Sequence, residues 1–388
     1  MEQKEIKEIN SLVIEKDDVY GSNYCRTTNS IRNELETELL KYYEQTDKME
    51  ALVFPSGMTA ISALFETVLQ YENGTKSEND TTNKVVIIGS ELYADTPKVV
   101  NYISKKYQNI TVIRVDIRNF DEIKNNFEKF KKEIKIFFIE TCTNPSGQMI
   151  DFDRYDELRK YAPNCVYCID NTWTSAFLFN PFKVVKAVDV VIESMTKYIS
   201  GSICIGGMMI GKKYIMKKVY KWNIIYGQFV GADHCQIFID GLKTINERMT
   251  IVSHLAINTA KYLEEKKLKV MYPMLESHPT YTINRNFLKL NTGCIVFHIK
   301  TNIDNKFDIR RIMASNTKFK FETSYGSKYT KLCNFPKFGD DTMYDYIKNN
   351  DISPNKGIWI RIAIGYESNI DDIKIGIDEL ILTFSNFK

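Results

Sequence analysis

The sequence predicts an α/β fold in which a mainly parallel sheet is covered by helices, followed by a smaller C-terminal α+β domain. Short, unbroken apolar runs recur through the first part of the chain and alternate with helical stretches. Runs of this kind suit strands that are buried on both faces, as they are in parallel sheets. From about residue 236 the pattern changes to a long helical stretch and then to widely separated strands. The 388 residues suffice for one large and one smaller domain.

The first predicted element is an amphipathic helix over residues 29–45, because apolar residues recur there at helical spacing after Asn29, which can cap the helix. Residues 71–83 are polar and rich in turn formers, which predicts an exposed connection without chemistry. The strands predicted for the parallel sheet cover residues 85–89, 110–116, 134–140, 165–170 and 188–194.

The C-terminal part is predicted to contain a long helix over about residues 236–266, strands over 293–300 and 358–365, and a final helix. No internal repeat or low-complexity tract interrupts this order. We therefore divide the chain into an N-terminal segment, a large domain and a C-terminal domain, at residues 1–45, 46–235 and 236–388.

Charge and hydropathy argue against several classes of protein. The chain has 52 lysines and arginines against 49 acidic residues, a formal net charge of +3, and no dense basic run interleaved with aromatic residues. Nucleic acid is therefore not an expected partner. The N-terminus is charged throughout, and no run approaches the roughly 18 apolar residues that would span a bilayer. We expect a cytoplasmic protein without a membrane partner.

The eight cysteines and four histidines show no disulfide framework and no metal-binding spacing. In a reducing compartment the cysteines are predicted to be free thiols. Cys165 and Cys168 have CxxC spacing, which allows a redox or zinc role. Side chains three residues apart in a strand point to opposite faces, so we interpret the pair as buried small hydrophobic residues. The histidines are isolated, and no catalytic metal is expected.

Three groups of residues stand near strand ends or a helix start, where ligands bind in such sheets. Asp170 closes an apolar strand and needs a charged or hydrogen-bonded partner, which a structural salt bridge or a helix cap would provide. Lys197 follows another apolar run and is either a surface residue with a buried stem or a partly desolvated nucleophile. Ser56, Gly57 and Met58 precede a helical run, as an ordinary helix start or as an anion site. Pyridoxal phosphate would account for all three, since it needs a Schiff-base lysine, a carboxylate on its ring nitrogen and a phosphate cradle.

Ordered motifs from about Tyr24 to beyond Arg361 resemble those of a known family. The motifs are "NYCRTTNSIRNELE", "FPSGMTAI", "ELYADT", "IETCTNPSGQMID", "CIDNTW", "ESMTKYISG", "GLKTINERM", "MYPMLESHP" and "WIRIAIGYES". On these motifs the chain resembles the pyridoxal-phosphate enzymes of cysteine and methionine metabolism, the group of cystathionine γ-synthase, cystathionine γ-lyase and methionine γ-lyase. The resemblance implies the PLP-dependent transferase fold of the aspartate-aminotransferase type (fold type I), with pyridoxal 5'-phosphate as the cofactor.

The resemblance also implies catalytic and substrate-binding roles. Lys197 would be the Schiff-base lysine, Asp170 would pair with the pyridinium nitrogen, and Tyr93 would stack on the ring and assist departure of the leaving group. Arg361 would bind the α-carboxylate of a small amino-acid substrate, and Ser324 would lie beside the substrate.

Further residues would contact the cofactor, its phosphate or its phenolic oxygen. The full implied set is Tyr24, Arg26, Ser56, Gly57, Met58, Tyr93, Asn144, Asp170, Ser194, Thr196 and Lys197. Tyr24 and Arg26, in the N-terminal segment, would reach the site of a neighbouring subunit. The resemblance therefore implies a homodimer with shared sites, and a homotetramer as in the family.

The sequence departs from the family in several places. After Lys197, "GSICIGG" (201–207) is one residue shorter than the family's GHSDxxxGG and lacks its histidine and aspartate. Thr323 and Asn23 stand where members that use cystathionine carry acids facing the distal ammonium of the substrate. Asp95 stands where methionine γ-lyases carry a cysteine, and we interpret it as a solvated loop residue or as an element of distal recognition.

Together, the residues and the resemblance predict an enzyme of γ- or β-elimination or replacement on a sulfur- or oxygen-substituted amino acid. Lys197 would move the protons at Cα and Cβ. The alternative hypotheses are transamination on the same scaffold and a cofactor-retaining homologue that no longer catalyses. A dinucleotide-binding protein is not supported, since no GxGxxG follows a strand.

Overall fold

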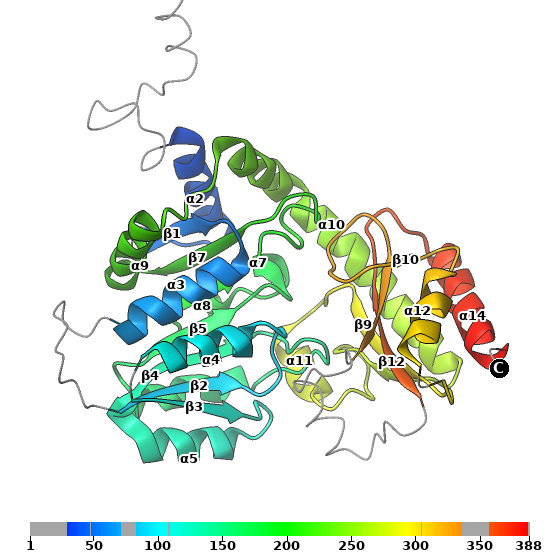
Figure 1. Cartoon of the computed structure of the whole chain (residues 1–388), viewed down its shortest axis with the longest axis horizontal. Helices are drawn as coiled ribbons and strands as arrows, with labels where there is room; N and C mark the ends of the chain where they lie inside the picture. The colour runs from blue at the N-terminus through cyan, green and yellow to red at the C-terminus, as the bar shows by residue number, and fades with distance from the viewer. Residues whose placement is uncertain are drawn as a thin grey trace, which may run out of the picture.

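The computed structural model of the chain describes residues 29–46, 48–70, 83–107, 109–303, 305–335 and 357–386. Figure 1 shows a large α/β part and a smaller part with a sheet of its own, linked by the long helix α10 (Ala232–Glu265). The connection predicted at residues 71–83 lies outside the described residues up to residue 82.

The large sheet has seven strands within the described residues, in the order β1-β7-β6-β5-β4-β2-β3. Strands β6, β5, β4, β2 and β3 are parallel, whereas β7 runs antiparallel to both of its neighbours. All five predicted strands are present, and β1 and β7 are additional. The strands are β1 (Met49–Phe54), β2 (Lys84–Gly89), β3 (Ile110–Val115), β4 (Ile134–Glu140), β5 (Val166–Asp170), β6 (Val190–Glu193) and β7 (Gly207–Lys212).

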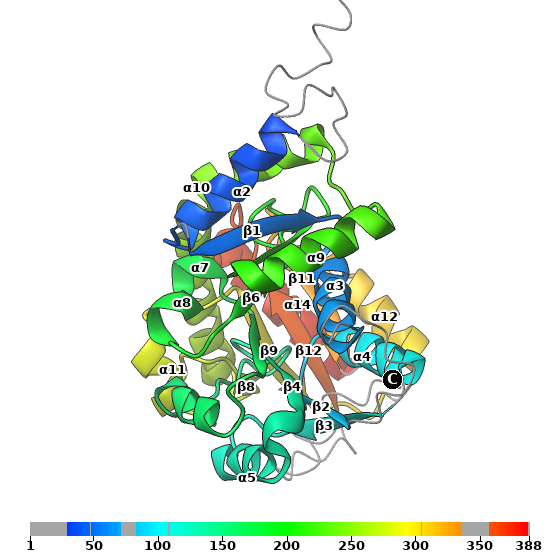
Figure 2. The same ribbon diagram turned by 90° about the vertical axis from the view of Figure 1, so that its left-hand side faces the viewer.

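Two apolar clusters fill the two faces of the large sheet. Along β2, Val85 and Ile87 pack in one cluster, whereas Val86 and Ile88 pack in the other. Because helices cover both faces, consecutive strand residues are all buried, which explains the unbroken apolar runs. Helices α3 (Gly57–Gln70), α4 (Thr96–Lys106) and α9 (Lys213–Tyr226) cover one face, and α2 (Ser30–Tyr42) and α5 (Phe120–Phe130) contribute to the other (Figure 2).

The same two clusters test the prediction for Cys165 and Cys168. Cys165 lies in one cluster and Cys168 in the other, so the pair consists of buried residues on opposite faces, as predicted. The cysteines among the described residues are free thiols, and Cys25 lies outside them. Among the described residues there is no group of histidine, cysteine and acidic side chains that could hold a metal ion. No described helix is long and apolar enough to cross a membrane.

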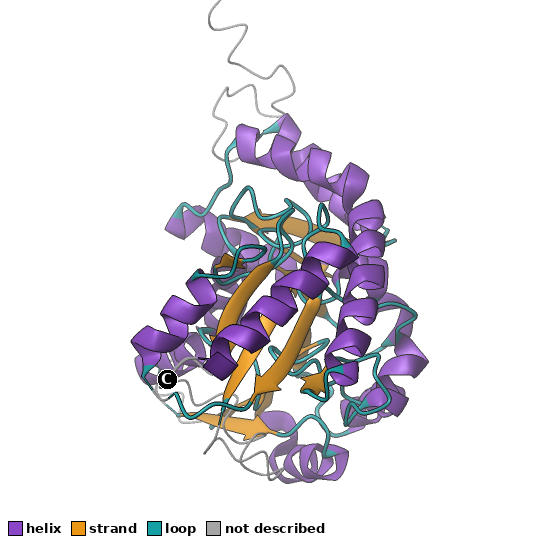
Figure 3. Cartoon of the chain, turned by 90° about the vertical axis from the view of Figure 1, so that its right-hand side faces the viewer, coloured by secondary structure: helices purple, strands orange, loops and turns teal. Residues whose placement is uncertain are grey.

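The smaller part is built on a second sheet, in the order β10-β11-β12-β9-β8. Its strands are β8 (Lys269–Met271), β9 (Cys294–Ile299), β10 (Lys320–Phe321), β11 (Lys331–Phe335) and β12 (Ile358–Ala363). Helix α10 packs against β8 and β9 and against α14 (Ile370–Asn386), which also contacts α12 (Lys306–Ala314). Figure 3 views the chain from the right-hand side of Figure 1, where the smaller part lies, and from there helices lie in front of the strands.

Two helix boundaries differ from the prediction. Helix α2 ends at Tyr42 rather than at residue 45, because Glu44 adopts a positive φ of 54° that a right-handed helix cannot accommodate. Helix α10 starts at Ala232, so the predicted division at residue 236 falls inside it. Shorter helices complete the fold, namely α6 (Phe152–Tyr155), α7 (Ser175–Leu178), α8 (Pro181–Val184), α11 (Tyr281–Phe287), η1 (Lys131–Glu133) and η2 (Asp156–Lys160).

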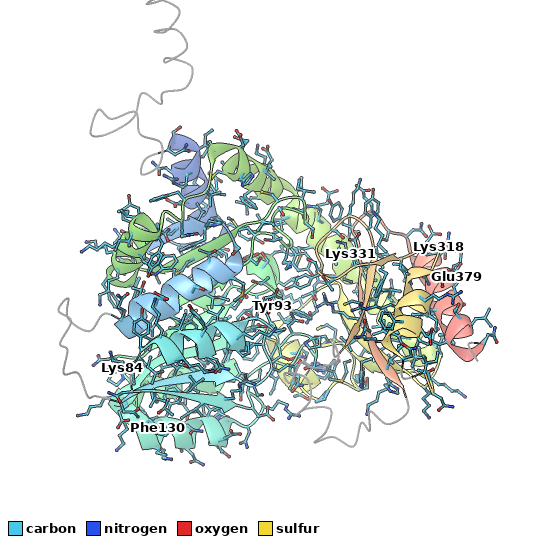
Figure 4. All side chains as sticks on the ribbon, viewed as in Figure 1. Lys84, Tyr93, Phe130, Lys318, Lys331 and Glu379 are labelled. Atoms are coloured by element: carbon cyan, nitrogen blue, oxygen red, sulfur yellow. The ribbon has the colours of Figure 1, made fainter. Side chains whose placement is uncertain are left out.

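The carboxyl ends of the parallel strands lie together at one edge of the large sheet. Glu140, the last residue of β4, is in register with Asp170, the last residue of β5. Asp170 is in turn in register with Ile192 of β6. Tyr93 follows β2, on the side of the large part that faces the smaller part (Figure 4). Polar side chains from several strands therefore converge at this edge.

Candidate active site

A cavity of about 370 Å³ lies at the carboxyl edge of the large sheet and is closed by residues of the smaller part. Tyr24 and Arg26 lie outside the described residues. The other predicted site residues all line this cavity, namely Ser56, Gly57, Met58, Tyr93, Asn144, Asp170, Ser194, Thr196, Lys197, Ser324 and Arg361.

Asp170 is a buried carboxyl group in the wall of this cavity. The backbone N–H of Thr172 donates to its Oδ1 at 2.9 Å. Burial raises the pKa of Asp170, while hydrogen bonds from Thr172 and the charge of Lys197 oppose that rise. A carboxylate placed in this way can accept a charge-assisted hydrogen bond from a cationic ring N–H.

Lys197 lies in the turn that follows β6, and its side chain lines the cavity. Its Nζ donates to Ser324 Oγ at 2.9 Å and lies 5.4 Å from the ring centroid of Tyr325. Burial lowers the pKa of Lys197 to about 8, and the charge of Arg361 adds to this effect. A substantial fraction of neutral amine, the nucleophilic form, is therefore present in weakly alkaline solution.

The start of α3 packs tightly against the turn that carries Ser194 and Thr196. A Cβ atom on Gly57 would lie 2.8 Å from the Cβ of Ser194, and one on Gly207 would lie 2.4 Å from the carbonyl oxygen of Ser56. Only glycine fits at such distances, so these segments can converge on the cavity. The first N–H groups of a helix and two nearby hydroxyl groups form an anion site. These residues fit a phosphate group.

Tyr93 and Asn144 reach the cavity from two loops. The backbone N–H of Tyr93 donates to Glu140 Oε1 at 2.5 Å. Burial raises the pKa of the Tyr93 hydroxyl, and the carboxylate of Asp95 raises it further, so the hydroxyl stays protonated and can donate a proton. Asn144 Oδ1 accepts a hydrogen bond from Arg361 Nη1 at 3.2 Å.

Arg361 reaches the cavity from β12 of the smaller sheet and is buried. A buried guanidinium group that lines a cavity suits a carboxylate ligand, which it can bind through two hydrogen bonds.

The loop of Ser324 and Gly326 packs against the turn that carries Lys197. Both residues have positive φ angles, 83° and 87°. A Cβ on Gly326 would lie 2.6 Å from the backbone carbonyl carbon of Lys197.

The loop at residues 201–207, where the sequence departs from the family, is anchored by hydrogen bonds to Thr196 and to Tyr325. Thr196 Oγ1 and the backbone of Gly206 exchange two hydrogen bonds of 3.1 Å each. Ser202 Oγ donates to the carbonyl oxygen of Tyr325 at 2.7 Å. Hydroxyl groups therefore hold this loop against the site residues without the family's histidine and aspartate.

Glu140, Trp173 and Tyr325 are among the cavity-lining residues that were not predicted from the sequence. Glu140 could have been found, because it closes the apolar run 134–140 just as Asp170 closes the next strand. Trp173 and Tyr325 contact each other with ring centroids 5.4 Å apart. They come from the two parts of the chain, and no local pattern indicates that contact.

Comparisons with known proteins agree with this geometry. A family model described as Cys/Met metabolism PLP-dependent enzyme matches residues 3–380. L-methionine gamma-lyase of Fusobacterium nucleatum subsp. nucleatum is 26% identical over 365 residues, which cover 92% of this chain and 86% of that protein. Putative cystathionine gamma-lyase 2 of Caenorhabditis elegans is 25% identical over 365 residues, covering 93% and 84%.

Solved structures resemble the chain as well. Cystathionine gamma synthase from Xanthomonas oryzae pv. oryzae, solved in complex with cystathionine, has a TM-score of 0.80 at 19% identity. The match covers 96% of this chain and 92% of that structure. The fold expected from the sequence is thereby confirmed.

Proposed function

Because the chain belongs to the family of Cys/Met metabolism PLP-dependent enzymes, we propose that it catalyses γ- or β-elimination or replacement on a sulfur- or oxygen-substituted amino acid. It is an enzyme of the lyase and synthase group, and pyridoxal 5'-phosphate is its cofactor. The observation that carries the proposal is the convergence of Lys197, Asp170 and Arg361 on one cavity. This set provides an amine, an acceptor for a ring N–H and a carboxylate-binding group.

The residues present fit the cofactor group by group. Lys197 Nζ would hold it covalently, and Asp170 would accept a hydrogen bond from its ring nitrogen. The helix start at Gly57 and the hydroxyl group of Ser194 would hold its phosphate, and the hydroxyl group of Thr196 would join them by turning away from Gly206. The close approach of Gly57 to Ser194, with no room for a Cβ, supports this assignment.

The protein side of the reaction consists of binding and proton transfer. When bound, the cofactor supplies an electron sink for the electron pair that remains when the substrate loses its Cα proton. Arg361 binds the α-carboxylate and thereby orients the substrate toward Lys197. The amine of Lys197, which the amino group of the substrate would displace from the cofactor, would remove the Cα proton and then move a proton at Cβ when the γ substituent leaves. The hydroxyl group of Tyr93 gives a proton to the departing sulfur or oxygen.

A dimer with shared sites belongs to the same proposal. The resemblance assigns Tyr24 and Arg26 to the site of a neighbouring subunit. Ile203 and Ile205, in the loop at 201–207, are 75% and 66% exposed in the single chain, which supports coverage by a neighbouring chain. Sedimentation should therefore give at least a dimer, and Arg26→Ala should weaken cofactor binding without unfolding the chain.

A substrate panel tests the reaction type. Purified enzyme is incubated with O-acetylhomoserine, O-succinylhomoserine, cystathionine, homocysteine, methionine or cysteine, with and without an added thiol. Elimination releases a 2-oxo acid and ammonia, whereas replacement gives a new thioether only when the thiol is present. Transamination would give a 2-oxo acid without ammonia and convert the cofactor to pyridoxamine phosphate. If the cofactor is bound and no member of the panel is converted, the proposal is wrong.

A further inference from the structure

Glu140 is an acid in the cavity wall to which the proposed mechanism gives no task. It is the last residue of β4, is 5% exposed and lies in register with Asp170 on the neighbouring strand. Burying a carboxyl group is unfavourable unless it forms hydrogen bonds. The groups that bond to Glu140 therefore indicate its role.

Glu140 interacts with the two loops that carry Tyr93 and Asn144. The backbone N–H of Tyr93 donates to Oε1 at 2.5 Å. The backbone N–H of Asn144 also acts on this carboxyl group and lowers its pKa. One buried side chain thus joins the loop after β2 to the loop after β4, and each loop places one proposed cofactor contact in the cavity.

A second buried carboxyl group, that of Glu91, connects the same two loops. In this case the carboxyl group lies in the loop after β2, and the donors lie in the loop after β4. Glu91 follows β2, and its Oε1 and Oε2 accept hydrogen bonds from Ser146 in the loop after β4, from the backbone N–H at 2.6 Å and from Oγ at 2.7 Å. Glu91 does not line the cavity and bonds to neither Tyr93 nor Asn144. It therefore serves as a matched control.

Apart from the two loops, the surroundings of Glu140 disfavour a charged carboxyl group at this position. Burial raises its pKa well above the ordinary value, and the negative charge of Asp170 raises it further. The backbone N–H groups of Tyr93 and Asn144 oppose this rise. The main favourable interactions of the charged side chain are thus those that hold the two loops.

We propose that Glu140 is a positioning residue that fixes Tyr93 and Asn144 beside the cofactor. The inference rests on the proposed placement of Tyr93 and Asn144 next to the cofactor ring. Glu140 acts through these two residues and does not itself exchange a proton with the substrate.

The test is a mutant cycle on cofactor binding by the apo-protein. Glu140→Ala and Glu140→Gln are made in the wild-type chain and in the double variant Tyr93→Ala, Asn144→Ala. The dissociation constant for pyridoxal 5'-phosphate and the circular dichroism of the bound cofactor band are measured, with far-ultraviolet circular dichroism as the check on folding. Glu91→Gln is the matched control.

In the wild-type chain, Glu140→Ala should weaken cofactor binding about tenfold and diminish the circular dichroism band, because the buried hydrogen bond to the Tyr93 loop and the interaction with the Asn144 N–H are lost. In the double variant the same change should matter less than about twofold, since the residues through which Glu140 acts are gone. Glu140→Gln, with one acceptor oxygen, should lie between wild type and Glu140→Ala. Glu91→Gln should weaken binding less than about threefold.

Two other outcomes would overturn the inference in distinguishable ways. An equal loss in both backgrounds, or no loss in either, would mean that Glu140 does not act through the two loop residues, and the proposed site would stand. If the double variant itself binds the cofactor with unchanged affinity and spectrum, the proposed placement of Tyr93 and Asn144 fails together with the inference.

Discussion

Lys197 and Ser324 are 127 residues apart in the chain, yet Lys197 Nζ lies 2.9 Å from Ser324 Oγ. Lys197 follows a strand of the large sheet, whereas Ser324 lies between β10 and β11 of the smaller sheet. The contact shows that the lysine turn is completed by the second part of the chain. Changes in either part should therefore affect the chemistry of this amine.

Lys197→Ala should abolish covalent attachment of the cofactor, because the other lysine that lines the cavity, Lys98, is exposed and pairs with Asp95 at 3.0 Å. Elimination should fall by at least about 1000-fold, since nucleophile and base are removed together. Borohydride reduction followed by peptide mass mapping checks the attachment. Lys331→Ala is the control, because Lys331 is largely buried, pairs with Glu322 at 2.9 Å and should leave the label on Lys197. A label retained by Lys197→Ala on another lysine would refute the assignment.

Cofactor capture by the apo-protein should rise with pH and reach half its maximum near pH 8, because burial lowers the pKa of Lys197 to about 8. The neutral amine is the attacking form, so an ordinary lysine would place this midpoint above pH 10. Arg361→Gln removes a nearby positive charge that favours the neutral amine, and it should move the midpoint upward. Stopped-flow absorbance over pH 6 to 10 measures both curves. A wild-type midpoint near pH 10 would contradict the environment described for Lys197.

Comparing Gly326→Ala with Gly227→Ala separates two destabilising effects of an added Cβ, namely backbone strain and steric crowding of Lys197. Both glycines have positive φ angles, 87° and 65°, so alanine should cost each about 1 kcal/mol of unfolding free energy. A Cβ at Gly326 would lie 2.6 Å from the backbone of Lys197, whereas a Cβ at Gly227 would meet nothing within 4 Å. Gly326→Ala should therefore cost about 2–4 kcal/mol and slow cofactor capture, while Gly227→Ala should leave capture unchanged. Urea unfolding and capture kinetics give the two readouts, and equal capture rates would argue against the crowding.

Some strands of the large sheet can be predicted from the sequence, and others cannot. The strand at residues 134–140 is evident because helices cover both sheet faces, so each of its residues except Lys135 is apolar until Glu140. Strand β7 is different, because its glycines at 207 and 211 weaken the strand signal. Gly207 is required by the close approach of Ser56, which is a tertiary contact and leaves no local pattern.

The site residues likewise fall into those with a local sequence pattern and those that depend on tertiary packing. Asp170 and Lys197 could be singled out because each polar side chain follows an apolar strand, and the carboxyl ends of parallel strands share an edge. That Arg361 and Ser324 join them depends on how the second sheet packs against the first. Only the resemblance to a known family pointed to these residues in advance, and it did not point to Trp173 or Tyr325.

Glu193→Gln should change how stability depends on pH. Glu193 is fully buried at the end of β6, and the hydroxyl group of Tyr43 donates to its Oε2 at 2.5 Å. Burial raises its pKa to about 8, from an ordinary value near 4.5, although the hydrogen bond from Tyr43 opposes this rise. The folded state therefore binds the proton more tightly than the unfolded state does.

The sign of the effect follows from this difference. The stability contributed by the protonated carboxyl group is fully present below about pH 4.5 and is lost as the pH rises to about 8. Relative to Glu193→Gln, which stays neutral, the wild-type unfolding free energy should fall by on the order of 4 kcal/mol across this range. Urea unfolding of wild type and Glu193→Gln at pH 5 to 9 measures the difference. A difference between wild type and Glu193→Gln that does not change with pH would mean that Glu193 is ionised in the folded protein throughout, with its charge compensated by neighbouring donors.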